Sequence, residues 1–378
     1  MIQRICRISI LMASVAIVLS GCLFAKKSAN GGAGQDVVSG IGTEPFELIE
    51  VAVSDRQWTG VAVSADGRIF VNFPRWSESA GPSVAEVLSR DGTSPYPANS
   101  WNKWDGESDG AKQFVCVQSV YIDRDNVLWV LDSGNPYFQG VIEGAPKLVK
   151  IDLQSNKVVK TWPFDSDAAL PQSYLNDVRI DIDRNIAYIT DSGVGAIVVL
   201  DLESGRVRRL LERHASTQSE AAILKVDGMK WKLADGTTPE VHADGIALDG
   251  AGNYLYYHAL TGKTLYRIAT GSLLNEMLTA EELGDRVERL ADTGAVDGML
   301  FGQDGLLYLS TLETNSISRY GRDGIVELVV RDQRLSWPDS FSTGSRGNIY
   351  VTVSQVHQGA SPKGPYRLFR LRDPAYLP

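Results

Sequence analysis

Aspartates recur at one position in a series of similar segments, and they are the residues best suited to chemistry. Each lies eight residues before a Gly or Asn that is typical of a tight turn: Asp177, Asp244, Asp297 and Asp339. If such carboxylates converge, they repel one another, so a positive group is needed nearby. Ca²⁺ or another divalent cation, or an organic cation such as an amine, would meet that need. The alternative is that each aspartate caps backbone N–H groups of its own loop, which requires no ligand.

Two further groups of residues are defined by the same turns. At the position of the aspartates, the two remaining segments carry Thr59 and Gln118. Counting six residues forward from each turn gives a second set, expected to form an outer partial ring: Phe73, Asp132, Asp191, His258, Thr311 and Val353. We predict that a ligand contacts six of these side chains, namely Thr59, Gln118, Phe73, Asp132, Asp191 and Thr311. His242, two residues before Asp244, is expected to face the same region.

The segments that carry these residues repeat one supersecondary unit. Each has a short strand, a tight turn and an apolar strand with aromatic residues, and the six copies occupy 60–73, 119–132, 177–191, 244–258, 297–311 and 339–353. Gly and Asn suit these turns because they tolerate positive φ. Third and fourth strands follow most hairpins. Six four-stranded units predict an all-β, six-bladed propeller in which equivalent residues surround one channel, whereas a two-sheet sandwich does not require six similar hairpins.

The two ends of the repeat predict how the ring closes. The sixth unit has a third strand at 366–371 and then lacks a fourth. The segment 46–53, FELIEVAV, is strand-like and precedes the first unit. We expect it to complete the sixth blade, which would cover an otherwise open sheet edge. Convincing helical periodicity occurs around 271–283, which we interpret as a loop insertion.

The first residues of the chain resemble a bacterial lipoprotein signal. Two arginines precede an apolar stretch that is too short for a membrane span, and Leu-Ser-Gly-Cys, ending at Cys22, fits a lipobox. The alternative is an ordinary secretory peptide with a chance cysteine. We predict a signal peptide over 1–21, a lipidated flexible tether over 22–44 and the propeller over 45–378. Because Leu23 and not Asp follows Cys22, the resemblance implies sorting to the outer membrane, on its periplasmic or outer side.

Charge and cysteine content limit the partners. The formal net charge is −9, and it is about −11 once the two arginines of the signal are removed. Such a surface repels nucleic acid and anionic lipid, so we expect no nucleic-acid partner and no membrane contact except through the lipid on Cys22. Cys116 would then be the one unmodified cysteine of a mature chain, which excludes a disulfide within it. We expect a monomer.

The sequence lacks several motifs that define enzyme classes. It contains no HExxH, no Cys-x-x-Cys and no phosphate-binding glycine-rich loop. His214 and His357 lie in predicted loops, where we expect them to be solvated. The remaining functional signal is therefore the arrangement of the aspartates and their neighbours.

The ordered series of segments resembles the yellow/major royal jelly protein family. It includes DVRIDIDRNIAYITDSG, HADGIALDGAGNYLYYH, DGMLFGQDGLLYLST and LSWPDSF. More distantly, the chain is similar to the senescence-marker-protein/gluconolactonase propellers. The first resemblance implies a secreted propeller of a family that includes binders of biogenic amines. The second implies a divalent cation at the channel mouth, with Asp177 and Asp244 at ligand positions, but Thr59 stands where that branch has a metal-binding Glu.

Three functional hypotheses follow. The first is a protein that binds a small polar or cationic ligand, or Ca²⁺, above the four aspartates, with aromatic residues such as Trp337 nearby. The second is a metal-dependent lactonase in which the aspartates hold a divalent cation and His242 or His258 transfers protons. The third is a scaffold of the cell envelope without catalytic activity.

Overall fold

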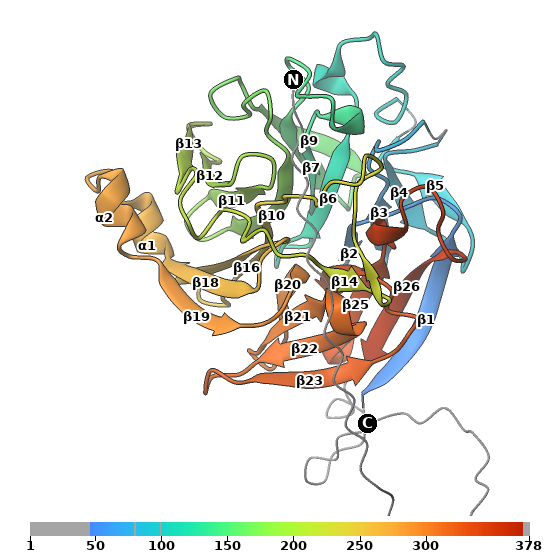
Figure 1. Ribbon diagram of the computed structural model, residues 1–378. Helices are drawn as coiled ribbons and strands as arrows, with labels where there is room; N and C mark the ends of the chain where they lie inside the picture. The colour runs from blue at the N-terminus through green and yellow to red at the C-terminus, as the bar shows by residue number, and fades with distance from the viewer. Residues whose placement is uncertain (1–45, 79–80, 99, 373–378) are drawn as a thin grey trace, which may run out of the picture. The chain divides into compact units, whose positions relative to one another are not determined.

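The computed structural model describes residues 46–78, 81–98 and 100–372. The predicted signal peptide and the whole predicted tether, with Cys22, lie outside these residues. Six four-stranded antiparallel sheets form the blades of a β-propeller (Figure 1). This architecture confirms the predicted fold class.

The blades follow one another in chain order. Blade one contains β2 (Val61–Val63), β3 (Ile69–Asn72), β4 (Val84–Val87) and β5 (Thr93–Pro95). Blade two contains β6 (Val117–Ile122), β7 (Val127–Asp132), β8 (Lys147–Asp152) and β9 (Lys157–Pro163). Blade three contains β10 (Leu175–Asp181), β11 (Ile186–Asp191), β12 (Ala196–Asp201) and β13 (Val207–Leu210).

The second half of the chain repeats the pattern. Blade four contains β16 (Ala243–Leu248), β17 (Tyr254–Ala259), β18 (Thr264–Ala269) and β19 (Glu288–Asp292). Blade five contains β20 (Val296–Phe301), β21 (Leu307–Thr311), β22 (Ser316–Tyr320) and β23 (Val326–Arg331). Blade six contains β24 (Pro338–Thr343), β25 (Ile349–Val353), β26 (Tyr366–Arg372) and, from the start of the domain, β1 (Glu47–Ser54).

Pairing of β1 with β26 closes the ring. The two strands run antiparallel from Glu47 opposite Arg372 to Ser54 opposite Tyr366. Ion pairs join the same strands, because Glu47 contacts Arg372 and Glu50 contacts Arg367. The prediction that 46–53 completes the sixth blade is therefore confirmed.

Apolar side chains pack between neighbouring blades. Trp129 and Trp162 of blade two stack with ring centroids 5.5 Å apart and share a cluster with Ile189 and Val198 of blade three. Burial on both faces explains why the strands of these hairpins are nearly continuous apolar runs instead of alternating ones. The hairpin turns have the expected backbone, as shown by φ values of 55° at Asn185 and 86° at Gly67.

Short elements lie outside the blades. The loop between β18 and β19 contains α1 (Thr270–Leu274) and α2 (Ala280–Gly284), which confirms the helical insertion predicted around 271–283. The connection between blades three and four contains a small hairpin of β14 (Lys225–Val226) and β15 (Met229–Lys230). Short 3₁₀ turns occupy Gly110–Lys112, Pro136–Phe138, Leu312–Thr314, Ser345–Gly347 and Val356–Gln358. In the part of the chain that the structure describes, none of the helices has the length and apolar character needed to cross a membrane.

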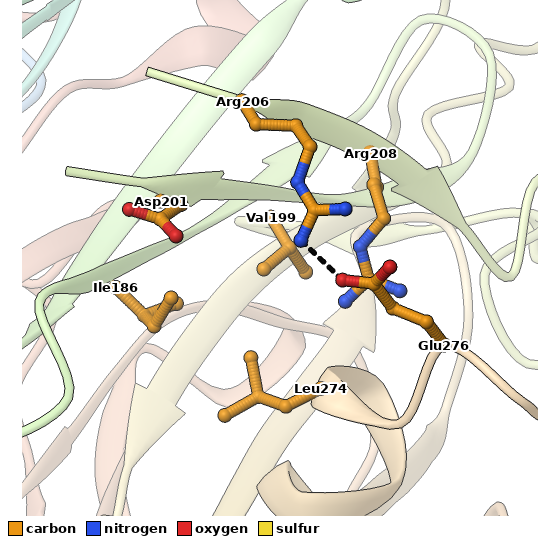
Figure 2. A pocket seen from close by; sticks show the side chains of 7 residues that line it. All are labelled: Ile186, Val199, Asp201, Arg206, Arg208, Leu274 and Glu276. Atoms are coloured by element: carbon orange, nitrogen blue, oxygen red, sulfur yellow. Dashed lines mark hydrogen bonds and ion pairs between the residues drawn. The ribbon is translucent and has the colours of Figure 1, made fainter. Parts of the chain in front are cut away.

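A shallow hollow of about 180 Å³ lies beside α1 (Figure 2). Its charged side chains interact with protein groups, since Arg206 pairs with Glu276 and Arg208 donates to the Leu273 carbonyl oxygen at 2.6 Å. These contacts attach the helical insertion to the outer strands of blade three, so we assign the hollow a structural role.

Candidate functional site

The first strands of the blades contain a β-bulge at the residues singled out in the sequence. The register between first and second strands shifts at this point in five blades. The shifted segments include Gln118, Asp177, Asp244, Asp297 and Asp339. A bulge bends its strand and re-aims a side chain. The same β-bulge therefore places a polar side chain at the start of the inner strand in five blades. We refer to the four acidic members of this set, Asp177, Asp244, Asp297 and Asp339, as the aspartate layer.

Short polar side chains of the second strands secure these bulges. Thr190 Oγ1 accepts a hydrogen bond from the Asp177 backbone N–H at 3.1 Å and donates to the Asp244 carbonyl oxygen at 2.6 Å. It thus joins blade three to blade four at the level of the aspartate layer. Equivalent buried side chains in three other blades bind the backbone in the same region: Asn72, Ser310 and Thr352.

Two glycines allow the inner strands to approach one another at this level. A Cβ atom added to Gly245 would lie 2.1 Å from the Asp297 carbonyl oxygen, and one added to Gly298 would lie 2.0 Å from the Asp339 carbonyl oxygen. Only a residue without a side chain fits such contacts. The repeated Asp-Gly pairs therefore bring consecutive members of the aspartate layer together.

The carboxyl groups of the layer are close enough to influence one another's ionisation. Asp244 and Asp339 are 4% and 5% exposed, and burial raises the pKa of each well above its ordinary value. The other carboxylates of the layer, Asp297 foremost, raise these two pKa values further. Burial also raises the pKa of Asp297 to about 7, although the indole N–H of Trp337, which donates to its Oδ2 at 2.7 Å, acts in the opposite direction. At neutral pH the layer therefore carries fewer negative charges than its four aspartates suggest.

Arg179 supplies a positive group that the sequence analysis did not identify. It lies on β10 two residues after Asp177, and its Nη2 is 3.5 Å from Asp177 Oδ2. The guanidinium is held by two backbone carbonyls, Val178 O at 2.7 Å and Met299 O at 2.9 Å. It therefore reaches from blade three to blade five. In the sequence, the arginine in the strand DVRI was the one feature that could have indicated a positive group here. Only the closed ring shows that this arginine faces the aspartates.

A chain of hydrogen bonds leads from the aspartate layer to aromatic residues beside the strands of blades two and three. Asn176 Nδ2 donates to Asp244 Oδ2 at 2.8 Å, and Gln118 Nε2 donates to Asn176 Oδ1 at 3.2 Å. Tyr174 Oη donates to Gln118 Oε1 at 3.0 Å. The Tyr174 ring stacks on Phe138, with centroids 5.1 Å apart, and Phe138 is 61% exposed. Gln118 is thus connected with the layer, as expected.

Trp337 is the aromatic residue in direct contact with the layer. It is fully buried, adopts a φ of 68°, and packs against Trp231 with ring centroids 4.8 Å apart. A left-handed backbone is costly for a bulky residue and persists only where its surroundings impose it. Together with the hydrogen bond to Asp297, this geometry indicates that the indole has a fixed position.

The two acids of the expected outer ring lie inside the blades and not at the channel mouth. Asp132 is fully buried, pairs with Lys147 Nζ at 2.7 Å and accepts hydrogen bonds from the backbone of residues 115, 116 and 134. Asp191 is also fully buried, pairs with Arg209 Nη2 at 2.8 Å and accepts from the Tyr174 backbone. Both carboxylates serve as loop caps, which was the alternative considered for the other aspartates.

Most remaining members of the predicted site are also structural. Phe73 packs against Trp58, and Thr311 bonds to Ser316 and Ser318 within blade five. Thr59 is fully buried and donates to the Gln118 carbonyl oxygen at 3.2 Å. Val353, the sixth member of the expected ring, belongs to the apolar core of blade six. All four side chains are buried within the protein.

The histidines are separated from the aspartate layer. His258 is fully buried, with Nδ1 2.7 Å from the Ala259 carbonyl oxygen and Nε2 3.0 Å from Thr293 Oγ1, and burial lowers its pKa. His242 Nδ1 accepts from the Ser219 backbone N–H at 3.0 Å, and burial lowers its pKa as well. Neither arrangement places an imidazole beside an aspartate of the layer.

The prediction that the loop histidines are solvated is wrong for His357. Its side chain is 1% exposed, stacks on Trp337 with centroids 5.7 Å apart, and has Nε2 3.0 Å from Asp227 Oδ2. His214 is partly buried, with Nδ1 2.8 Å from Ser216 Oγ. The connection between blades three and four folds back onto blade six, which no local pattern around His357 reveals.

The donor set does not fit a divalent cation as it stands. Within the described ranges, no three acidic, histidine or cysteine side chains are grouped so that they could hold a metal ion. Asp177 faces Arg179, and Asp297 accepts the Trp337 indole N–H, so two of the four carboxylates already have protein partners. Ca²⁺ needs six to eight oxygen ligands at once. We therefore derive no chemistry through a metal at this site.

Comparison with solved structures shows the same fold. The chain resembles a luciferin-regenerating enzyme (11% identity, 86% of this chain and 95% of that chain covered, TM-score 0.51). It also resembles a gluconolactonase from Xanthomonas campestris (10% identity, 90% and 100% covered, TM-score 0.50) and a PQQ-bound aldose sugar dehydrogenase from Streptomyces coelicolor (11% identity, 88% and 99% covered, TM-score 0.51). At such identities these likenesses concern the fold alone.

Comparison with sequences identifies the family. No curated protein sequence matches the chain. The sequence model described as "Major royal jelly protein" matches residues 115–370, from the first strand of blade two to the last strand of blade six, which is more than half of the chain. This six-bladed propeller, with its bulged aspartate layer, belongs to the major royal jelly protein family.

Proposed function

We propose that the chain binds a small organic cation with a single positive charge, such as a primary amine, at the aspartate layer. The observation that carries the proposal is the charge state of the layer. Asp177 is paired with Arg179, burial and neighbouring carboxylates raise the pKa values of Asp244 and Asp339 well above the ordinary value, and the pKa of Asp297 is about 7. The layer therefore carries less than its full negative charge near neutral pH, which suits a monovalent ligand better than a divalent ion.

The surroundings of the layer support an amine with an aromatic or apolar body. An ammonium group gains from contact with carboxylates and ring faces together. Trp337 contacts Asp297, and the stacked rings of Phe138 and Tyr174 are linked to Asp244 through Gln118 and Asn176.

Three indole compounds that differ in charge test this proposal by titration calorimetry: tryptamine, the neutral tryptophol and indole-3-acetate. At the aspartate layer tryptamine is expected to bind at least about 10-fold more tightly than tryptophol, a difference of about 1.4 kcal/mol. Asp297→Asn should remove this preference, because it replaces the carboxyl whose pKa is about 7. Asp323→Asn, in the exposed turn after β22, is the matched control and should behave as the wild type.

Two outcomes would overturn the proposal. One is that neither tryptamine nor any other amine of a panel binds at about 1 mM. The other is that amine binding is unchanged in Asp297→Asn.

The lactonase hypothesis retains one supporting observation. A carboxyl with a pKa of about 7, such as that of Asp297, is suited to accept and donate protons at neutral pH. The pH-stat assay of lactone hydrolysis, with added Ca²⁺ and with EDTA, tests it. Turnover that EDTA abolishes, or a melting temperature that Ca²⁺ raises, would favour metal-dependent hydrolysis, and the absence of both would leave ligand binding or a scaffold role.

We also propose that the protein is exported and anchored through lipid on Cys22. The support is the lipobox-like Leu-Ser-Gly-Cys after a short apolar stretch. In a bacterial host the wild type is expected in the membrane fraction, and Cys22→Ser in the soluble extracytoplasmic fraction or as an uncleaved precursor. Equal distribution of both variants would contradict lipidation.

A further inference from the structure

The opposite end of the channel contains a second cavity, distinct from the aspartate layer. It has a volume of about 750 Å³, and all six blades contribute to its lining. Its walls come from the distal ends of the inner strands and from the hairpin turns, including Tyr121, Leu248, Phe301 and Phe341. A cavity of this size, lined by apolar and polar side chains together, matches the sites that hold drug-sized molecules. We call it the vestibule.

Arg179 is the positive group that the vestibule presents to a ligand. Blade three contributes only this residue to the lining, and its side chain is 8% exposed. Its Nη1 and Nη2 donate to protein acceptors, whereas Nε–H has no acceptor among the residues that the structure describes. The Tyr121 ring lies against the guanidinium, 5.3 Å from Cζ to the ring centroid. The guanidinium is thus held in place with a donor left for another molecule.

The acidic residues of the lining are occupied by their own turns. Asp123 accepts from the Trp129 indole N–H at 2.7 Å and from the Val127 backbone at 3.0 Å. Asp249 accepts from the backbone of Asn253 at 2.6 Å. Arg124 at the rim is paired with Asp183. Both aspartates therefore already have hydrogen-bond donors, whereas Arg179, although paired with Asp177 at 3.5 Å, keeps its Nε–H without an acceptor among the described residues.

We propose that the vestibule binds a small monocarboxylate with an apolar or aromatic body. The carboxylate would accept from Arg179 Nε–H, and the body would lie between Phe301, Phe341 and Leu248. A charge-assisted hydrogen bond to a buried arginine is strong enough to select an anion over its neutral analogue. This site lies at the other end of the channel from the amine site and does not depend on it.

Calorimetry with indole-3-acetate, 4-phenylbutyrate and octanoate, each against the corresponding alcohol, tests the proposal. At least one acid is expected to bind with a stoichiometry of one and at least about 10-fold more tightly than its alcohol. Arg179→Gln should remove that preference while retaining weak binding of the alcohol. Leu248→Trp should narrow the vestibule where the body of the ligand lies and weaken binding of both, and Leu328→Trp, on the exposed outer strand β23, should leave both unchanged.

The two proposed sites can be separated with the same variants. Leu248→Trp should leave tryptamine binding intact, and Asp297→Asn should leave carboxylate binding intact. The vestibule proposal is overturned if none of the three acids binds at about 1 mM. It is also overturned if the acids bind no better than their alcohols, or if Leu248→Trp leaves binding of the acids unchanged.

Discussion

Asp177 and Arg179 lie two residues apart on β10 and form an ion pair of 3.5 Å inside the channel. Both side chains are nearly buried, and the guanidinium continues to the Met299 carbonyl oxygen of blade five. The pair stands between the aspartate layer and the vestibule. The protein therefore provides its own counter-charge at the place where the sequence suggested a metal ion.

Arg179→Met is expected to destabilise the fold by about 3 kcal/mol at pH 8, because it leaves Asp177 buried without its partner. The loss should be smaller at pH 5, where carboxyl groups of the layer are more readily protonated. Urea denaturation at both pH values measures it, with Arg322→Met, an exposed arginine, as the control. Equal stability of Arg179→Met and the wild type at pH 8 would show that the pair contributes nothing.

The contribution of Asp297 to stability should decrease as the pH rises from about 4 to about 7. The pKa of Asp297 is about 7 in the folded state and about 4 in an unfolded chain, so the folded state holds an additional proton between these values. The free energy of unfolding that this proton contributes is complete below pH 4. It decreases by about 1.4 kcal/mol per pH unit between the two pKa values and is lost as the pH rises through 7. Burial of Asp244 and Asp339 acts in the same direction.

Denaturation of Asp297→Asn across this pH interval measures the contribution of that carboxyl. The variant should show a shallower decrease than the wild type, since its amide does not ionise. Asp323→Asn should follow the wild-type curve. The same pH dependence in the wild type and in Asp297→Asn would show that the pKa of Asp297 is not perturbed.

The pair of Asp132 and Lys147 should matter for stability and not for ligand binding. Both side chains are at most 1% exposed, and breaking such a pair leaves a charge buried alone. Lys147→Ala is expected to cost about 3–5 kcal/mol in the free energy of unfolding. Asp132→Asn leaves the Lys147 ammonium buried without its partner and should also destabilise the fold, but it should leave amine affinity unchanged by calorimetry at a temperature where the variant is folded. An affinity loss of about 10-fold in Asp132→Asn would return this residue to the binding site.

Gly245→Ala should disturb both the fold and the aspartate layer. The new methyl group would lie 2.1 Å from the Asp297 carbonyl oxygen, so the inner strands of blades four and five must separate. We expect a loss of about 2–3 kcal/mol or more, since overpacking in a closed core costs about this much. Gly271→Ala, in α1 with no atom within 4 Å of the added methyl group, is the control and should be neutral or slightly stabilising. Unchanged stability of Gly245→Ala would mean that the blades separate freely.

Local patterns in the sequence determined the six hairpins, the strand that closes the ring and the helical insertion. These features can be predicted because they depend on residues that are neighbours in the sequence: turn glycines and asparagines, apolar runs and a missing fourth strand. The offset of eight residues also identified the aspartates and Gln118 correctly as equivalent positions, because equal register in repeated units leads to equal height along the channel.

Only the tertiary structure decided which polar residues face one another. The offset of six residues marked Asp132 and Asp191 as equivalent positions, but only the structure shows that each is paired with a cation of its own blade, Lys147 and Arg209 respectively. The role of Arg179, the burial of His357 and the vestibule depend on contacts between residues far apart in the chain. Such contacts form when the ring closes. The ring also buries the aspartates and brings them close together, and three of the four have raised pKa values because water is excluded and like charges are close. No spacing along the chain specifies this condition.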